Sequence, residues 1–142
     1  MTPESAFSLA SAFALCSWVL LALFPGRRSV TVVWAGAVLP ALLALLYLAL
    51  LAARLGHAQG GFGSLAEVQR LFSDPWLLLA GWVHYLAFDL FIGAWEARDA
   101  ARRGVPRWAL LPCLLLTFLV GPVGLLAWLG TRAALARGGA AV

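Results

Sequence analysis

Hydrophobic residues dominate four long stretches of the chain, and short polar or glycine-containing segments separate them. The stretches cover residues 6–24, 30–53, 76–95 and 108–130. Each is close to or above the roughly 20 apolar residues that a helix needs to cross a bilayer. The pattern therefore predicts an all-α membrane protein, with four transmembrane helices forming one bundle in a single domain, 1–142.

The segment between the second and third stretches is long enough to hold a further element. Ser64 and Glu67 have the spacing of a capping box, in which each side chain caps a backbone N–H at the start of a helix. We expect a short amphipathic helix from there to Phe72. It could lie on the membrane surface or pack as an ordinary loop helix.

The fourth stretch contains a break in its helical pattern. Gly121, Pro122 and Gly124 fall about halfway along it. Proline lacks the backbone donor that a helix interior uses, and glycines permit close approach of a neighbouring helix. The sequence thus predicts a kinked fourth helix, with a structural role for the kink favoured over a cavity-lining one.

Charged residues are scarce and are mostly arginine. Hydrophobic residues make up 63% of the chain and charged residues 11%, whereas soluble proteins carry about 25% charged residues. Lipid must therefore cover most of the surface. Six of the ten arginines lie in the first and third connections and four elsewhere, which predicts cytoplasmic short loops and both termini outside. No contiguous basic face with exposed aromatics suggests nucleic-acid binding.

The third stretch carries an unusual polar set at membrane depth. On a helix, Trp82, Tyr85, Asp89, Gly93 and Glu96 fall on one face. An adjoining strip contains Gly81, His84, Phe88, Phe91 and Trp95. The remaining arc is aliphatic: Leu79, Val83, Leu86, Leu90 and Ala94. We expect this arc to face lipid and the polar and aromatic residues to face the bundle.

Asp89 is the residue of this set that most needs an explanation. An ionised Asp near a helix centre costs on the order of 2.5–3.5 kcal/mol on insertion scales, so it is paired, protonated or used. Tyr85 lies one turn away, whereas His84 is 140° round the helix at 100° per residue. One interpretation is a structural polar contact between helices. The other is an acid–base site, since a carboxyl in a low dielectric keeps its proton more readily than one in water.

Metal and haem chemistry find little support in the sequence. The chain has two histidines, and His57 falls in a loop while His84 falls within an apolar stretch. No His/Glu cluster has the spacing of metal ligands. We expect no metal and no cofactor.

The third-stretch block from Trp82 to Trp95, together with Gly121-Pro122-Val123-Gly124, resembles the abscisic-acid-deficient-four-like family. The similarity covers roughly residues 7–132. Members of that family are small four-helix membrane proteins, and plant members act in neoxanthin synthesis. The resemblance implies a carotenoid-related role, with an isomerisation that opens an epoxide and creates an allene.

That reaction asks for one acid and one base. On the resemblance we expect Asp89 to protonate the epoxide oxygen and His84 to accept the carbon proton, with Tyr85 beside them. The expected ligand-binding residues are aromatic or small: Trp82, Phe88, Phe91, Gly93 and Trp95. Catalysis itself stays open, because a subunit that holds a pigment or quinone in a larger complex would use the same residues.

The expected partners are the lipid bilayer, a carotenoid or other isoprenoid lipid, and a second copy or other membrane subunits. The composition, rich in alanine, leucine and arginine, favours a bacterial inner or photosynthetic membrane.

Overall fold

The computed structural model describes residues 2–138, which are helical with no strand among them. Three helical segments are long and apolar enough to cross a membrane: Pro3–Leu23, Ser29–His57 and Pro75–Arg103. The first is helix α1. The second comprises η1 (Ser29–Val38), α2 (Leu39–Arg54) and η2 (Leu55–His57), and the third is α4. These lengths and their apolar composition confirm the prediction of a helical membrane protein.

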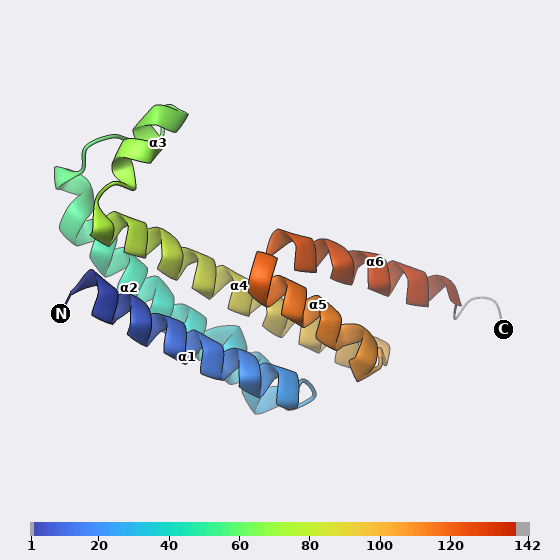
Figure 1. Cartoon of the computed structure of the whole chain (residues 1–142). Coiled ribbons are helices and arrows are strands. Elements are labelled where there is room, and N and C mark those ends of the chain that lie inside the picture. The colour runs from blue at the N-terminus through green and yellow to red at the C-terminus, as the bar shows by residue number, and fades with distance from the viewer. Residues whose placement is uncertain (1, 139–142) are drawn as a thin grey trace.

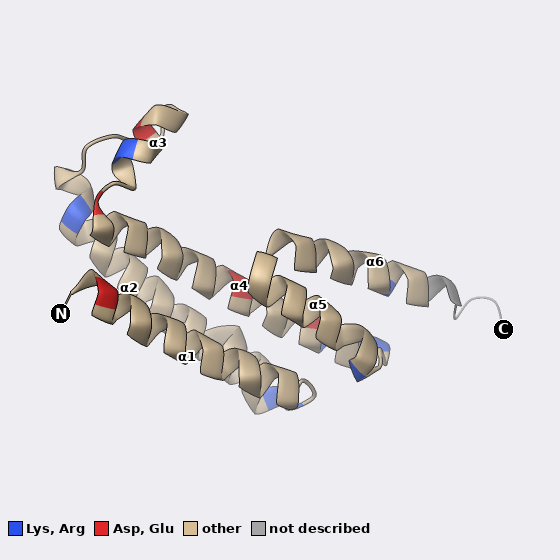
Figure 2. Ribbon diagram, in the orientation of Figure 1, with Lys and Arg blue, Asp and Glu red and all other residues tan. Residues whose placement is uncertain are grey.

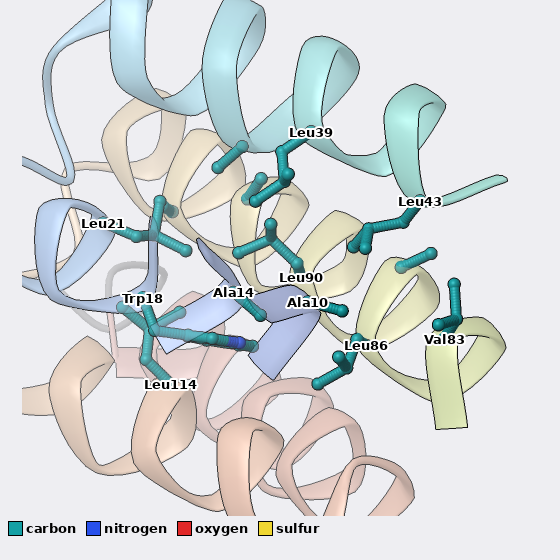
Figure 3. Packing of buried hydrophobic residues seen from close by; sticks show 14 of the residues in the cluster. Ala10, Ala14, Trp18, Leu21, Leu39, Leu43, Val83, Leu86, Leu90 and Leu114 are labelled. Carbon is teal, nitrogen blue, oxygen red and sulfur yellow. The ribbon is translucent and has the colours of Figure 1, made fainter. Parts of the chain in front are cut away.

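The helix α4 is the centre of the bundle. It packs against α1, η1 and α2 on one side and against α5 (Arg107–Val120) and α6 (Pro122–Gly138) on the other. Figure 1 shows α1, α2 and α4 running side by side as long rods, with the shorter α5 and α6 over one half of α4 only. The side chains of Ala14, Leu39 and Leu90 meet in the core between α1, η1–α2 and α4 (Figure 3).

A wide helical turn begins the second span. Segment η1 is a π-helix, and the N–H of Leu39 reaches back to the carbonyl of Trp34. The next residue, Pro40, cannot donate a helical hydrogen bond and would crowd the carbonyl four residues before it. The wider turn accommodates that proline, as π-bulges do inside α-helices. The guanidinium of Arg98 on α4 fills the space beside Gly36 and donates to the carbonyl of Thr31.

The predicted loop helix is confirmed as α3 (Leu65–Leu71). The hydroxyl of Ser64 accepts from the N–H of Glu67 at 3.2 Å. The carboxylate of Glu67 accepts from the N–H of Gly63 at 3.0 Å, one residue before the position that a capping box would use. The cap starts α3 after the irregular segment that follows η2, and α3 leads to the start of α4.

The prediction of one kinked helix over 108–130 is wrong. The chain breaks into α5 and α6 at Gly121, and α6 turns back along α5 as an antiparallel hairpin. Gly121 has φ 16° and ψ −82°, and Pro122 then occupies the first turn of α6, where its missing N–H is not needed. A Cβ at Gly124 would collide with the backbone of Thr117, so the reversal depends on small residues at the crossing.

The hairpin also changes the expected topology. Because α6 returns toward the end of the bundle where α5 begins, the start of α1 and the end of α6 lie at opposite ends (Figure 1). The expectation that both termini lie outside counted 108–130 as one crossing, and it stays a prediction.

The predicted orientation of α4 is confirmed for Gly93 and Glu96, which are buried, but it is wrong for the aliphatic arc and part of the aromatic strip. The aliphatic arc that was expected to face lipid is buried against α1 and α2; it comprises Leu79, Val83, Leu86, Leu90 and Ala94. His84, Phe88 and Phe91 of the aromatic strip are exposed instead. Lipid is as apolar as leucine, so aromatic rings can face it without a free-energy penalty. Small and aliphatic residues let helices pack closely, which favours the aliphatic arc in the helix interface.

Candidate functional site

Asp89 lies where the α5–α6 hairpin ends. A Cβ at Gly121 would lie 2.6 Å from its Oδ1 and 2.8 Å from its Oδ2, so the carboxyl group rests against the turn of the hairpin. Its Oδ2 is buried and accepts no hydrogen bond from the residues that the structure describes. Buried polar atoms without a partner are rare in proteins and mark sites of strain or chemistry. Asp89 is therefore the strongest candidate for a reactive group in this structure.

Tyr85 lies one turn before Asp89, on the same side of α4. Its hydroxyl donates to the carbonyl of Phe118 at 3.2 Å, with the carbonyl of Leu119 at 3.4 Å. Both carbonyls belong to the last turn of α5, where the helix leaves them without intrahelical donors. Tyr85 thus fastens the end of α5 to α4, and its hydroxyl lies next to the carboxyl of Asp89.

A groove of about 650 Å³ leads along the surface between α1 and α4 to Tyr85. We call it the α1–α4 groove. Its lining is mostly aromatic or aliphatic: Pro3, Glu4, Phe7, Ser8, Phe72, Pro75, Leu78, Leu79, Gly81, Trp82 and Tyr85. Its size falls within the range of about 300–1,000 Å³ that is usual for small-molecule sites.

The groove exists because the fourth stretch breaks. The hairpin covers α4 from its C-terminal end only as far as Asp89 and Tyr85, and the other half of α4 faces α1 with no helix over the seam. Trp82 sets one wall of the groove: its indole N–H donates to the hydroxyl of Ser11 at 3.0 Å, and its ring lies 5.2 Å from that of Phe7. The ring of Tyr85 lies 5.2 Å from Trp82 on the other side.

His84 lies in a different cleft. Its ring stacks on Phe88 at 4.6 Å and lies 5.6 Å from the ring of Tyr47 on α2. This α2–α4 cleft, of about 260 Å³, also includes Phe72 and Gly81, which border the α1–α4 groove too. The structure thus brings together Tyr85 and Asp89, as the sequence predicts, and places His84 across the seam formed by Phe72 and Gly81.

The other predicted ligand-binding residues have separate surroundings. Phe88 and Phe91 are 58% and 45% exposed on the outer face of α4. Gly93 is buried, and a Cβ there would overlap the indole of Trp18, so its place is in helix packing. The ring of Trp95 lies 5.8 Å from the guanidinium of Arg132 on α6.

Glu96 is the buried group whose partner the sequence did not reveal. It is fully buried, and the hydroxyl of Thr117 on α5 lies 2.9 Å from its Oε1 and 3.1 Å from its Oε2. The arginines that follow it on α4 have other partners: Arg98 reaches Thr31, and Arg102 pairs with Asp99 at 3.6 Å. The sequence did place Glu96 on the same face of the helix as Asp89. That alignment could have indicated that one neighbouring helix contacts both carboxyl groups.

Among residues 2–138, no three His, Cys, Asp or Glu side chains are placed to hold a metal ion. The fold and site define a multi-pass helical membrane protein, with an apolar groove that reaches Tyr85, the neighbour of Asp89 on α4. The chain belongs to the ABA4-like (ABA DEFICIENT 4-like) family, whose sequence model matches residues 5–128. Membership makes it a carotenoid-related membrane protein, of the family associated with neoxanthin synthesis. Neither the curated proteins nor the solved structures gave a match to the chain.

Proposed function

We propose that the protein binds a carotenoid or similar isoprenoid in the α1–α4 groove and isomerises an epoxide end group at Asp89. The observation that supports this most is the unpartnered carboxyl oxygen of Asp89, next to the tyrosine that closes the groove. A long apolar substrate can enter sideways from lipid, because the α1–α4 groove is open to the surface of the bundle. Aromatic side chains such as Phe7 and Trp82 offer flat surfaces for a polyene.

One carboxyl group can perform both proton transfers of such an isomerisation. Asp89 gives its proton to the epoxide oxygen as the carbon–oxygen bond breaks. The resulting carboxylate then takes a proton from the adjacent chain carbon, and the electron pair of that C–H bond forms the new double bond of the allene. The substrate keeps its formula and Asp89 regains its proton, so the step needs no oxidant or reductant. Tyr85 positions the end group of the substrate and takes no part in either proton transfer.

This scheme replaces the Asp89–His84 pair that the family resemblance suggested with a single acid–base residue. His84 borders the neighbouring cleft, behind Phe72, so the two schemes differ in what they require of it. With a single carboxyl group, His84→Ala retains turnover. With a pair, the same substitution abolishes it.

The test is conversion of an epoxy-carotenoid by the purified protein in lipid, followed by chromatography of the extracted pigment. We expect Asp89→Asn to lower turnover by at least 100-fold, in keeping with the contribution of general acid–base catalysis. Phe88→Leu is the matched control, because Phe88 lies on the outer face one residue away. Turnover by Asp89→Asn at the wild-type rate would refute the assignment.

The second candidate is a subunit that holds a pigment or quinone without changing it. The apolar groove supports a binding subunit and an enzyme equally. Only the carboxyl group of Asp89 favours the enzyme. Pigment that is extracted unchanged at a fixed ratio to protein, equally from wild type and from Asp89→Asn, would establish the binding role. The membrane that the protein occupies and its association with itself or other subunits stay predictions.

A further inference from the structure

The hairpin formed by α5 and α6 begins and ends at the same end of the bundle. The thiol of Cys113, halfway along α5, lies 3.6 Å from the hydroxyl of Thr131, just past the middle of α6. At the next residue, the guanidinium of Arg132 lies 3.4 Å from the carboxylate of Asp99 near the end of α4. The second half of α6 is therefore level with the first half of α5 and the end of α4.

The hairpin is too short to cross a bilayer. The 14 residues of α5 extend about 21 Å at 1.5 Å per residue, against a hydrocarbon core of about 30 Å. Its turn at Gly121 lies against Asp89, about four helical turns before the end of α4. Non-helical backbone at this depth is tolerated where protein buries it, and here α4 lies under the turn.

The reversal gathers most of the arginines at one end. Counted along the sequence with four crossings, the arginines divide six to four. With α6 turned back, eight of the ten lie at the end that holds the 24–28 and 104–106 connections. These are Arg27, Arg28, Arg98, Arg102, Arg103, Arg107, Arg132 and Arg137. Figure 2 shows this end bordered by basic segments.

The opposite end has a different character. It holds Arg54 and Arg70 together with three acids, Glu4, Glu67 and Asp74, so its formal charge is negative. At the basic end, Trp108 is 73% exposed at the start of α5, and the guanidinium of Arg27 lies over the ring of Phe24 at 4.9 Å. Tryptophan and arginine at the end of a span are typical of the membrane–water interface.

We infer that α5–α6 is a re-entrant hairpin, that the C-terminal end of α6 shares the cytoplasmic face with both short connections, and that this basic face binds anionic phospholipid headgroups. The side chains of Arg102 and Arg103 are 67% and 40% exposed there. Each guanidinium contacts Asp99 and can still bind a lipid phosphate. Excess positive charge selects the cytoplasmic side of a membrane, whose leaflet carries the anionic lipids. This inference is independent of any activity at Asp89.

Labelling of single cysteines in sealed membrane vesicles tests the topology. In a background with Cys16→Ser and Cys113→Ala, a membrane-impermeant maleimide is applied to Gly26→Cys, Ser73→Cys or Ala134→Cys. We expect the cysteines at 26 and 134 to be labelled from the same side, and the cysteine at 73 from the opposite side. Labelling of 134 together with 73 would overturn the re-entrant hairpin.

Thermal unfolding in vesicles tests the lipid partner. Phosphatidylcholine vesicles with and without phosphatidylglycerol are compared for wild type, Arg27→Gln/Arg28→Gln and Arg54→Gln/Arg70→Gln. Both double variants remove two positive charges, one pair from each end. We expect phosphatidylglycerol to raise the unfolding midpoint of wild type and of the 54/70 variant alike, and to raise that of the 27/28 variant less. Equal reductions in both variants, or no rise in wild type, would overturn the lipid assignment.

Discussion

Glu96 and Asp89 are two carboxyl groups on one face of α4 that the protein treats differently. Glu96 is fully buried and receives the hydroxyl of Thr117, whereas Oδ2 of Asp89 has no hydrogen-bond partner among the described residues. A partnered buried group contributes to one defined packing, and removing its partner leaves a desolvated polar group. Glu96 therefore fits a structural role and Asp89 a chemical one.

The Glu96–Thr117 contact can be measured with a double-mutant cycle. Thr117→Val alone is expected to lower the unfolding free energy by about 1–3 kcal/mol, because it leaves the carboxyl without a donor. In a Glu96→Leu background the same substitution is expected to cost close to nothing, since no polar group is left behind. Unfolding in detergent gives the four free energies. Equal costs of Thr117→Val in the two backgrounds would show that the contact contributes nothing.

Gly93 provides a second test at the level of single residues. A methyl group there would overlap Trp18 and press on Leu21, so Gly93→Ala is expected to destabilise the protein by about 1–3 kcal/mol, the usual cost of overpacking. Gly130→Ala on α6 is the matched control, because a Cβ there meets no atom within 4 Å. Thermal unfolding compares the two. A loss in Gly130→Ala as large as in Gly93→Ala would contradict the packing seen around Gly93.

Among the elements, the break between α5 and α6 has the largest effect on the rest of the molecule. It uncovers half of α4, and that uncovered seam is the α1–α4 groove. It also places the helix end carbonyls of Phe118 and Leu119 where Tyr85 can reach them. The groove and the tyrosine contact thus depend on two residues, Gly121 and Pro122.

Replacing Gly121 and Pro122 with alanine should favour one continuous helix. Glycine and proline are less favourable than alanine in a helix interior by about 1 and 3 kcal/mol. We expect the double variant to move a cysteine at 134 toward the opposite side of the membrane, as measured by maleimide labelling. A double variant that folds and keeps the wild-type labelling would show that packing on α4, and not the break itself, holds α6 in place.

The helices also show how much of the fold could be predicted from the sequence. Hydropathy predicts where α1, the second span and α4 lie, and the cap at Ser64 predicts α3, because these depend on local composition and local hydrogen bonds. The aliphatic arc of α4 was wrongly predicted to face lipid, because hydrophobicity alone does not distinguish a lipid-facing residue from one packed between helices. The glycine and proline near 121 identify a break, but only the packing of Gly124 against Thr117 decides between a kink and a reversal.

Seen as a whole, the molecule consists of a bundle of long helices with a hairpin fastened at two levels. At the turn, Tyr85 bonds the end of α5, and at the basic end Asp99 pairs with Arg103 at 2.9 Å and with Arg132 at 3.4 Å. The side chain of Asp99 is 7% exposed, so solvent screens these pairs less than it screens surface ion pairs. The family was predictable from the third-stretch block, whereas this arrangement was not.

Loss of the Asp99 contacts should loosen α6 before any other helix. Asp99→Asn is expected to speed amide hydrogen exchange in α6 and leave α1 and the buried half of α4 unchanged, because Arg132 is the side chain that ties α6 to this point. Hydrogen exchange read by mass spectrometry resolves the helices. Faster exchange spread evenly over α1, α4 and α6 would mean that Asp99 stabilises the whole bundle instead.

The turn at Gly121 also imposes an order on assembly. A half-length hairpin cannot be held across a membrane while the chain is being made, so it must seat itself against α4 once α4 is already in place. Until then, Asp89 and Glu96 would both face hydrocarbon, an arrangement that costs several kcal/mol. A chain stalled at that stage would carry two unshielded acids within α4, the helix on which the rest of the bundle packs.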